Sequence, residues 1–402
     1  MTAAVADLPS GWRWVAVRYL SRNLDYLRVP KNSGERSEMV GDIPYWGANS
    51  VQGYVDQSLV DGQMVLVGED GAPFFDPLAT VAFAVDEPIW PNNHVHVLRP
   101  SADVDFRFLA ASLNAVDYSL YVKGSTRDKL NQSELSGIVL AVPPHPEQRR
   151  IADFLDREMA QIDAFIADQE ELIGLLAERR AATISHSVTG LSGAQRVSVR
   201  RLVTYLDQGW SPICENFPAS EDQWAVLKVG CVNGGRFSPE QNKALPFEIE
   251  PRENLAVSDG DILVSRGNTR ELVGSAAIVE SDHPKLLVSD LLYRIRVDPS
   301  RVLGNYLVAA FGSRSVRGQI ESSAKGTSAS MQKLSQGDVL DLVVELPPLS
   351  EQRSALVQLN KETSELDAAI ADAREAIALS RERRAALISA TVTGKIDIRD
   401  AA

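Results

Sequence analysis

Two short polar stretches carry the residue types that could bind an acidic polymer. They read KGSTRDKLN at 123–131 and KGTSASMQK at 325–333. Lysine offers a point charge to phosphate, whereas arginine, asparagine and glutamine can form paired hydrogen bonds with the edges of guanine or adenine. Glycine and serine also mark ordinary turns, so each stretch taken alone is more typical of a solvated surface loop.

Two other loops contain candidate contact residues. The stretch SRGNTR at 265–270 follows an apolar run and holds Arg266, Asn268 and Arg270. These side chains suit base reading, although a solvated loop explains them equally well. The aromatic turn IPYWGAN offers Tyr45 and Asn49, but core packing beside a turn is the commoner use of such residues.

The sequence offers little for metal binding or catalysis. His94 and His96 alternate along an expected strand and share a face, but two ligands alone do not define a metal site. Cys214 and Cys231 have no ligand-like histidine spacing around them, which argues against zinc and against a disulfide framework. There is no Asn/Asp-Pro-Pro-aromatic turn and no G-x-x-x-x-G-K-[ST] loop. We therefore expect no catalytic centre and no metal in this chain.

An internal repeat supplies the elements that must position these loops. PPHPEQRR to ERRAATISHSVTG spans Pro143–Gly190, and PPLSEQRS to ERRAALISATVTG spans Pro347–Gly394. Each residue of the second copy lies 204 positions after its counterpart, without a gap. Apolar residues recur at heptad spacing in both copies, which predicts two long helices that pair through a coiled-coil seam. The heptad residues are Leu155, Ile162 and Leu176 in the first copy and Leu359, Leu366 and Leu387 in the second.

Each helical copy follows a block of divergent sequence that reads as short strands with one or two helices. Strands are expected at 12–20, 61–68, 79–85, 94–98, 196–202, 259–266 and 291–297, and helices at 106–114 and 305–311. The predicted class is α+β, with two α/β domains separated by two long helices in an antiparallel coiled coil and an internal pseudo-two-fold repeat. The predicted boundaries are 1–146 and 191–350 for the domains, and 147–190 and 351–402 for the helices with the C-terminal tail.

Bulk composition describes an ordinary globular chain of 402 residues, with 44% hydrophobic and 24% charged residues. No apolar run approaches the roughly 20 residues of a membrane span, and the first residues lack a signal-peptide pattern, so we expect a cytoplasmic protein. The net charge of −13 argues, taken alone, against nucleic acid. Only local fields act at a contact, however, because charges beyond ~10 Å are screened.

The order of block, helix, block, helix favours an arrangement with internal two-fold symmetry. Antiparallel pairing would bury both seams and hold two different blocks at a set spacing. Duplex DNA suits such an arrangement, because two-fold related readers in successive major grooves sit ~34 Å apart. Blocks that differ while the helices match would then read different base sequences.

Over its full length the chain resembles the specificity subunits of type I restriction–modification systems. The resemblance rests on PPxxEQR before each helix, on ERRAALIxxxVTG after it, and on the KGST and KGTS loops. It implies two target recognition domains that each read half of a bipartite DNA site, and helices that set the half-site spacing. It also implies docking of two methyltransferase subunits, which methylate adenine N6, and through them of restriction subunits. The cofactors would then belong to partners: S-adenosylmethionine to the methyltransferase, and ATP with Mg to the restriction subunit.

The resemblance turns the polar loops into predicted DNA contacts. The predicted set is Lys123, Ser125, Thr126, Arg127, Lys129, Asn131, Lys325, Thr327, Ser328, Ser330, Gln332 and Lys333, together with Arg266, Asn268, Arg270, Tyr45 and Asn49. A second predicted set docks the methyltransferase, because a two-fold scaffold needs two equal docking sites. It comprises Arg179, Arg180, Arg383 and Arg384, which could equally be solvated residues at a helix C-terminus.

Three other functions remain open on the sequence alone. The chain could serve a methylation-only or other phage-defence assembly, which neighbouring genes would reveal. A nuclease with two DNA-binding arms would need a carboxylate cluster with a lysine, and we find none convincing. A coiled-coil scaffold without DNA would fail to bind any duplex.

Overall fold

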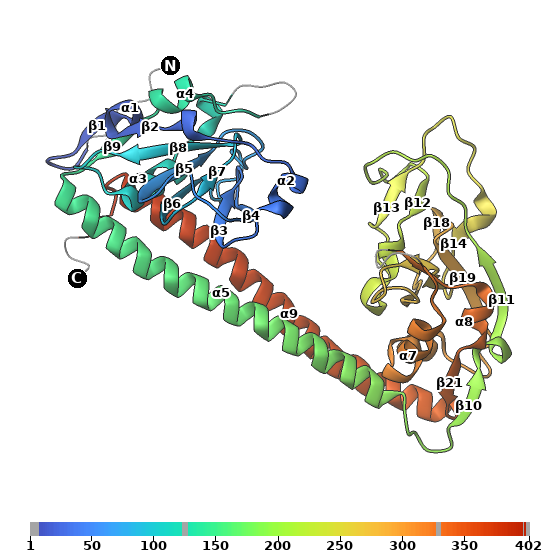
Figure 1. Cartoon of the computed structure of the whole chain (residues 1–402). Helices are drawn as coiled ribbons and strands as arrows, with labels where there is room; N and C mark the ends of the chain where they lie inside the picture. Colours follow the sequence, from blue (N-terminus) through green and yellow to red (C-terminus); the bar gives the residue numbers. More distant parts are fainter. Residues whose placement is uncertain (1–7, 123–127, 327–330, 397, 399–402) are drawn as a thin grey trace. The chain divides into compact units, whose positions relative to one another are not determined.

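The structure is a computed structural model that describes residues 8–122, 128–326, 331–396 and 398. The chain forms two compact units, one of residues 1–170 with 374–402 and one of residues 171–373. Each unit contains one α/β domain, part of α5 (His145–Ser187) and part of α9 (Leu349–Val392) (Figure 1).

The first domain is built on a four-stranded sheet of order β2-β8-β5-β6. A three-stranded sheet, β4-β3-β7, and the antiparallel pair β1–β9 complete it. Helix α3 packs on the larger sheet over a core that includes Phe108 and Leu113. Its elements are β1 (Arg13–Ala16), α1 (Val17–Leu20), β2 (Ser21–Asn23), η1 (Asp25–Leu27), α2 (Ser33–Glu38), β3 (Ile43–Trp46), β4 (Val51–Val55), β5 (Gln63–Gly68), β6 (Ala82–Asp86), β7 (Trp90–Pro91), β8 (Val95–Pro100), α3 (Phe106–Asn114), η2 (Tyr118–Leu120), α4 (Gln132–Gly137) and β9 (Val139–Val142).

The second domain repeats this plan. Its sheet β11-β19-β15-β17 has the strand order of the first sheet, α6 takes the place of α3, and β10–β21 takes the place of β1–β9. A second four-stranded sheet, β13-β12-β18-β14, has no counterpart of equal size. Its elements are β10 (Gln195–Ser198), η3 (Val199–Arg201), β11 (Val203–Gln208), β12 (Ala225–Leu227), η4 (Val229–Gly235), β13 (Asn242–Ala244), η5 (Glu253–Leu255), β14 (Ala256–Val257), β15 (Ile262–Ser265), β16 (Gly267–Asn268), β17 (Ala276–Ile278), β18 (His283–Leu287), β19 (Leu292–Val297), α6 (Gly304–Gly312), α7 (Arg314–Ser323), β20 (Gln332–Lys333), α8 (Gln336–Asp341) and β21 (Val343–Leu346).

The predicted fold class is confirmed, with corrections in detail. The strand expected at 12–20 ends at Ala16, and Val17–Leu20 is a helical turn. Val17 and Leu20 are buried three residues apart while Arg18 and Tyr19 are exposed, a spacing that suits a helix rather than a strand. The aromatic turn expected from Ile43 begins instead with strand β3.

A buried glutamine fastens each long helix to its own domain. Gln148 is 2% exposed, and its amide donates to the carbonyls of Pro143 (3.0 Å) and Asp103 (3.3 Å) while accepting from the Asp105 N–H (3.0 Å). The same three bonds recur in the second unit around Gln352. There the partners are Pro347 (2.9 Å), Arg301 (3.1 Å) and the N–H of Leu303 (2.9 Å). The glutamine of the repeated EQR motif therefore joins each long helix to its domain, and we call its three hydrogen bonds the glutamine joint.

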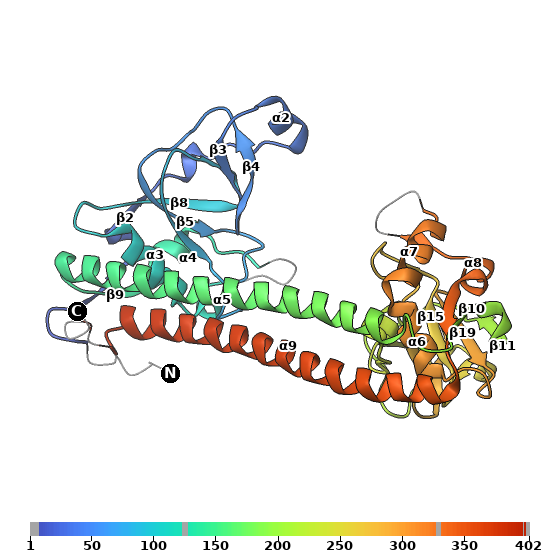
Figure 2. The same ribbon diagram turned by 90° about the horizontal axis from the view of Figure 1, so that it is seen from below.

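The two long helices pair with opposite directions in both units (Figure 2). In the first unit Arg384, from the C-terminal part of α9, binds Asp163 of α5 at 2.9 Å. In the second unit Arg180, from the C-terminal part of α5, binds Asp367 of α9 at 2.7 Å. The two ion pairs are counterparts at the repeat offset of 204. Apolar seam residues such as Ile162 and Leu366 are buried, as the heptads predict.

The chain just after α9 lies against the start of the chain. A Cβ at Gly394 would meet Pro9 at 2.5 Å, and Ile398 packs against the core of the first domain. Gly394 has a φ of +73°, which an L side chain rarely adopts. Gly394 and Ile398 therefore belong to the first unit.

Candidate nucleic-acid interface

Two of the predicted loops meet in the second domain. Strand β16 pairs antiparallel with β20, so that Gly267 faces Lys333 and Asn268 faces Gln332. Lys325 and Lys333 also exchange backbone hydrogen bonds of 3.0 and 2.9 Å. The pairing brings the 265–270 and 325–333 stretches to one place, which their separation in sequence did not reveal.

The basic side chains at this place differ in accessibility. Lys325 and Lys333 are exposed, and Arg270 is 68% exposed with Glu321 at 3.7 Å. Arg266 is half-buried and donates to the Asp290 carbonyl at 3.3 Å. Asn268 accepts from the Thr269 N–H at 2.9 Å, while its amide nitrogen is buried without a hydrogen bond among the described residues. The lysines and Arg270 are therefore the groups best placed to meet a phosphate backbone.

The base of the 123–131 stretch is held in a similar way in the first domain. Asp70 and Lys129 form an isolated bridge, and the Leu130 N–H donates to the Glu69 carbonyl at 2.8 Å. Lys129 is 47% exposed, and its ammonium lies 2.9 Å from the Glu69 carboxylate. Asn131 is exposed before α4 and makes no capping bond with its side chain. Lys129 thus stands partly neutralised, whereas Asn131 is accessible.

Two candidates from the aromatic turn serve the fold. Tyr45 is 1% exposed, its hydroxyl accepts from the Lys31 N–H at 2.9 Å, and Arg36 covers its ring at 4.8 Å. The prediction of a DNA contact by Tyr45 is therefore wrong, because its side chain lies in the core. Asn49 is exposed, but its amide donates to the Gly71 carbonyl at 3.0 Å.

Seven predicted contacts lie outside the described residues. They are Lys123, Ser125, Thr126 and Arg127 in the first stretch and Thr327, Ser328 and Ser330 in the second. Their role stays a prediction.

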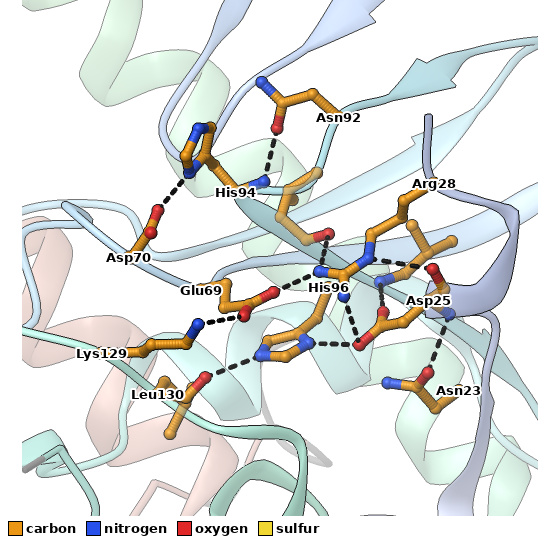
Figure 3. Close-up of polar contacts among 12 residues, drawn as sticks. Asn23, Asp25, Arg28, Glu69, Asp70, Asn92, His94, His96, Lys129 and Leu130 are labelled. Carbon is orange, nitrogen blue, oxygen red and sulfur yellow. Dashed lines mark hydrogen bonds and ion pairs between the residues drawn. The ribbon is translucent and has the colours of Figure 1, made fainter. Parts of the chain in front are cut away.

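A network of charged side chains surrounds His96 and includes Lys129 of the first stretch (Figure 3). His96 on β8 is 1% exposed; its Nδ1 lies 2.6 Å from the Asp25 carboxylate and its Nε2 lies 2.8 Å from the Leu130 carbonyl. Glu69 is paired with both Arg28 and Lys129. Both ring nitrogens of His96 face oxygen atoms, which fixes the orientation of the ring.

The network lowers the pKa of both carboxyl groups. Burial by itself would raise the pKa of Asp25, since desolvation disfavours a carboxylate, but the hydrogen bonds from His96 and from the Val97 N–H outweigh burial and lower it. Burial also opposes ionisation of Glu69, and Lys129 and Arg28 lower its pKa by hydrogen bonding to it. Both groups are therefore held as anions inside the domain.

The same residues resemble a metal site in geometry. Asp25, Glu69 and His96 could each offer one ligand atom, and these atoms lie within 4.8 Å of one another. Arg28 and Lys129 already occupy the Glu69 carboxylate. A cation there would have to displace two like charges, so we interpret the group as an ion-pair network. The expectation that the chain holds no metal stays a prediction.

The predicted docking arginines divide into two kinds. Arg180 and Arg384 make the interhelical ion pairs with Asp367 and Asp163, and their guanidinium groups are engaged within the helix pair. Arg179 is exposed and Arg383 is 70% exposed, with Glu158 at 3.4 Å. One turn before each exposed arginine stands a leucine, Leu175 or Leu379, and each is 57% exposed. Each helix therefore presents the same accessible leucine–arginine pair.

The sequence did not indicate which buried side chains contact the ends of the loops. His96 was considered only as a metal ligand beside His94, and Asp25 and Glu69 were not singled out. Tyr293 on β19, whose hydroxyl donates to the Leu334 carbonyl at 3.0 Å, was also overlooked. An available signal was the alternation of His96 within an otherwise apolar strand, where a polar side chain needs a buried partner.

Comparisons with known proteins found a matching family model and several similar proteins. The family model described as type I restriction modification DNA specificity domain matches residues 27–172. The EcoEI specificity subunit of Escherichia coli, a type I restriction enzyme subunit, is 31% identical over 155 residues, which cover 38% of this chain and 26% of that protein. The putative type I restriction enzyme specificity subunit S.HindORF215P of Haemophilus influenzae is 24% identical over 352 residues, covering 87% of this chain and 86% of that protein.

A solved structure shares the fold. It comes from work on complex assembly and conformational transition of a type I R-M system, and it matches 97% of this chain and 100% of its own with a TM-score of 0.68 at 16% identity. At that identity the likeness concerns the fold alone. Among the described residues, no helix is long and apolar enough to cross a membrane.

Proposed function

Because the chain belongs to the family of type I restriction–modification specificity subunits, we propose that each of its α/β domains reads one half of a split, asymmetric DNA site. The observation that carries this proposal is the matched placement of two unlike polar stretches. Stretches 123–131 and 325–333 end on the same framework of strands in their two domains, yet their side chains differ. Two domains with the same arrangement of strands but different side chains in these stretches could read two different half-sites.

The helices would set the distance between the half-sites. Their two copies have equal length, and each is fixed to its domain by the same glutamine joint. A rigid joint at each domain would transmit the length of the helices to the DNA as spacing.

The exposed pairs Leu175–Arg179 and Leu379–Arg383 would each dock one methyltransferase subunit. Arginine is enriched in binding hot spots, and each leucine adds exposed apolar surface beside it. Restriction subunits would join through the methyltransferases. S-adenosylmethionine would be held by the methyltransferase, and ATP with Mg by the restriction subunit, while this chain would supply no catalytic group.

Methylome sequencing tests the reading of a split site. Cells that carry this chain with its methyltransferase should methylate adenines in an asymmetric, interrupted sequence. Exchange of residues 191–346 for the block of a relative should change one half of that sequence and leave the other half intact. A continuous or palindromic methylated site would contradict the proposal.

Docking is tested by charge substitution at the two leucines. Leu175→Asp and Leu379→Asp should each lower the number of bound methyltransferase subunits from two to one, and the double variant should bind none. Mass measurement of the assembled complex by light scattering distinguishes these states. Ile213→Asp, at a residue that is 87% exposed in the second domain, is the control and should still bind two. Full binding by the double variant would place docking elsewhere.

A further inference from the structure

In each domain, a side chain of the larger sheet contacts the backbone carbonyl of one leucine, and the two leucines are equivalent. In the first domain, His96 Nε2 contacts the Leu130 carbonyl oxygen at 2.8 Å, and in the second, the Tyr293 hydroxyl donates to the Leu334 carbonyl at 3.0 Å. Leu130 and Leu334 are counterparts at the repeat offset of 204. They follow Lys129 and Lys333 directly, so each marks the C-terminal base of a polar stretch.

The register of the strands shows that the two contacts are equivalent. His96 of β8 faces Val67 of β5, and Tyr293 of β19 faces Val264 of β15. The N–H groups of the two leucines are bonded alike. Leu130 donates to the Glu69 carbonyl at 2.8 Å, and Leu334 to the Arg266 carbonyl at 2.8 Å.

Each leucine is thus fixed at both of its backbone groups. The N–H is bound by the residue that follows β5 or β15, and the carbonyl by a side chain of the neighbouring strand. Leu130 is fully buried and Leu334 is 2% exposed, so water cannot replace a lost bond easily. These bonds hold the described residues at the C-terminal end of each polar stretch.

The side chains that fix the carbonyls differ in kind. The phenol of Tyr293 has two charged neighbours, Arg266 as a hydrogen-bonding partner and Asp338 through its charge. His96 stands among charges from every element around it: Asp25 on η1, Arg28 just after η1, Glu69 just after β5, and Lys129 at the stretch itself. The first domain therefore uses an imidazole among four charged residues for the contact that a phenol hydroxyl makes in the second.

We propose that His96 and Tyr293 are positioning residues for DNA reading, each setting how selectively its own domain discriminates base pairs in its half-site. Neither side chain touches DNA in this proposal; each acts through the backbone of the adjacent stretch. The inference rests on the proposed function, because it assumes that stretches 123–131 and 325–333 read DNA.

The decisive variant is Tyr293→Phe in the full chain bound to its methyltransferase. It removes one oxygen atom and leaves the Leu334 carbonyl without its donor. Loss of one such bond corresponds to about a 2- to 10-fold change in an equilibrium constant. We expect discrimination in the second half-site to fall by that factor, with the first half-site unchanged. The measurement is the Kd, at fixed salt, for duplexes that carry one altered base pair in either half.

His96 gives the reciprocal test. His96→Phe should weaken discrimination in the first half-site alone. His96→Tyr should recover part of it, because a hydroxyl is the donor that the second domain uses. A purely structural role for His96 would not predict rescue confined to one half-site. Tyr205→Phe removes a hydroxyl that bonds Asp207 at 2.9 Å, away from Leu334, and is the control that should change neither half.

The possible outcomes distinguish a failure of the proposed function from a failure of the positioning role. If wild type does not discriminate base pairs in two halves, the proposed function fails. If wild type does, and folded Tyr293→Phe keeps full discrimination or loses it equally in both halves, the positioning role is wrong. Denaturation curves of the variants show whether each one is folded.

Discussion

At the scale of single residues, the buried network of the first domain combines positioning with stability. Asp25 and Glu69 are anions enclosed by protein, and each is stabilised by donors that a solvated carboxylate would not have. Both have a lowered pKa in the folded state. Each therefore adds stability above its unfolded pKa of roughly 4, and this contribution is lost as the pH falls through the folded value.

We predict a pH-dependent effect of Glu69→Gln. At pH 7 the variant should be less stable than wild type, because Arg28 and Lys129 lose the charge that they bind. The difference should shrink as the pH falls below about 4, where the carboxyl group becomes protonated in the unfolded state and, at lower pH, in the folded state. Urea unfolding at several pH values measures it. Glu87→Gln, at an exposed position, should show little difference at any pH; a Glu69→Gln deficit that stays constant down to pH 2 would contradict the assignment.

The sequence identified residue types better than residue roles. It singled out Lys129 and Lys333, and the structure places them at equivalent ends of two stretches. It could not show that Lys129 also binds Glu69, because that partner comes from 60 residues earlier in the chain. Tyr45 was misjudged for a related reason, since an aromatic turn reads alike whether its ring enters the core or faces solvent.

At the scale of elements, long periodic segments could be predicted and short irregular ones could not. Helix 106–114 has its expected bounds, and the heptads predicted α5 and α9. Strands β16 and β20 contain two residues each, too few for any periodicity, so the pairing that joins two candidate loops was invisible in the sequence. The repeated EQR motif was visible, but its buried glutamine bonds were not.

Those bonds make the joint between helix and domain testable. Gln148→Ala would remove the partner of two carbonyls and of the Asp105 N–H; the bond to Pro143 is buried and the other two are partly buried. At roughly 0.5–1.5 kcal/mol for each bond, the free energy of unfolding of the first unit should fall by about 2–4 kcal/mol. Chemical denaturation gives the value, with Gln161→Ala on the exposed face of α5 as the matched control. A loss no larger than that of the control would show that the joint contributes nothing.

At the scale of the whole molecule, the two units share side-chain contacts as well as sequence motifs. Both units use the same glutamine joint, the same interhelical arginine–aspartate pair and the same fixation of a leucine below the polar stretch. The two units differ in the size of the second sheet, which has three strands in the first domain and four in the second, and in the side chains of the two stretches.

This division predicts that spacing can be changed without changing sequence preference. The two units divide at 170/171 on α5 and at 373/374 on α9, close to repeat counterparts. Seven residues inserted after Glu171 and seven after Glu375 would add one heptad to each helix and keep the seam in register. The added length is about 10 Å at ~1.5 Å per residue, or up to about three base pairs at ~3.4 Å each.

Methylome sequencing of cells with the doubly extended chain should show both original half-sites with a longer interruption between them. Extension of α5 alone should instead reduce methylation, because one helix would lose its partner over the added turns and the seam would no longer match. An unchanged interruption in the doubly extended chain would mean that the helices do not set the spacing. Altered half-sites would mean that the domains do not read independently of the helices that carry them.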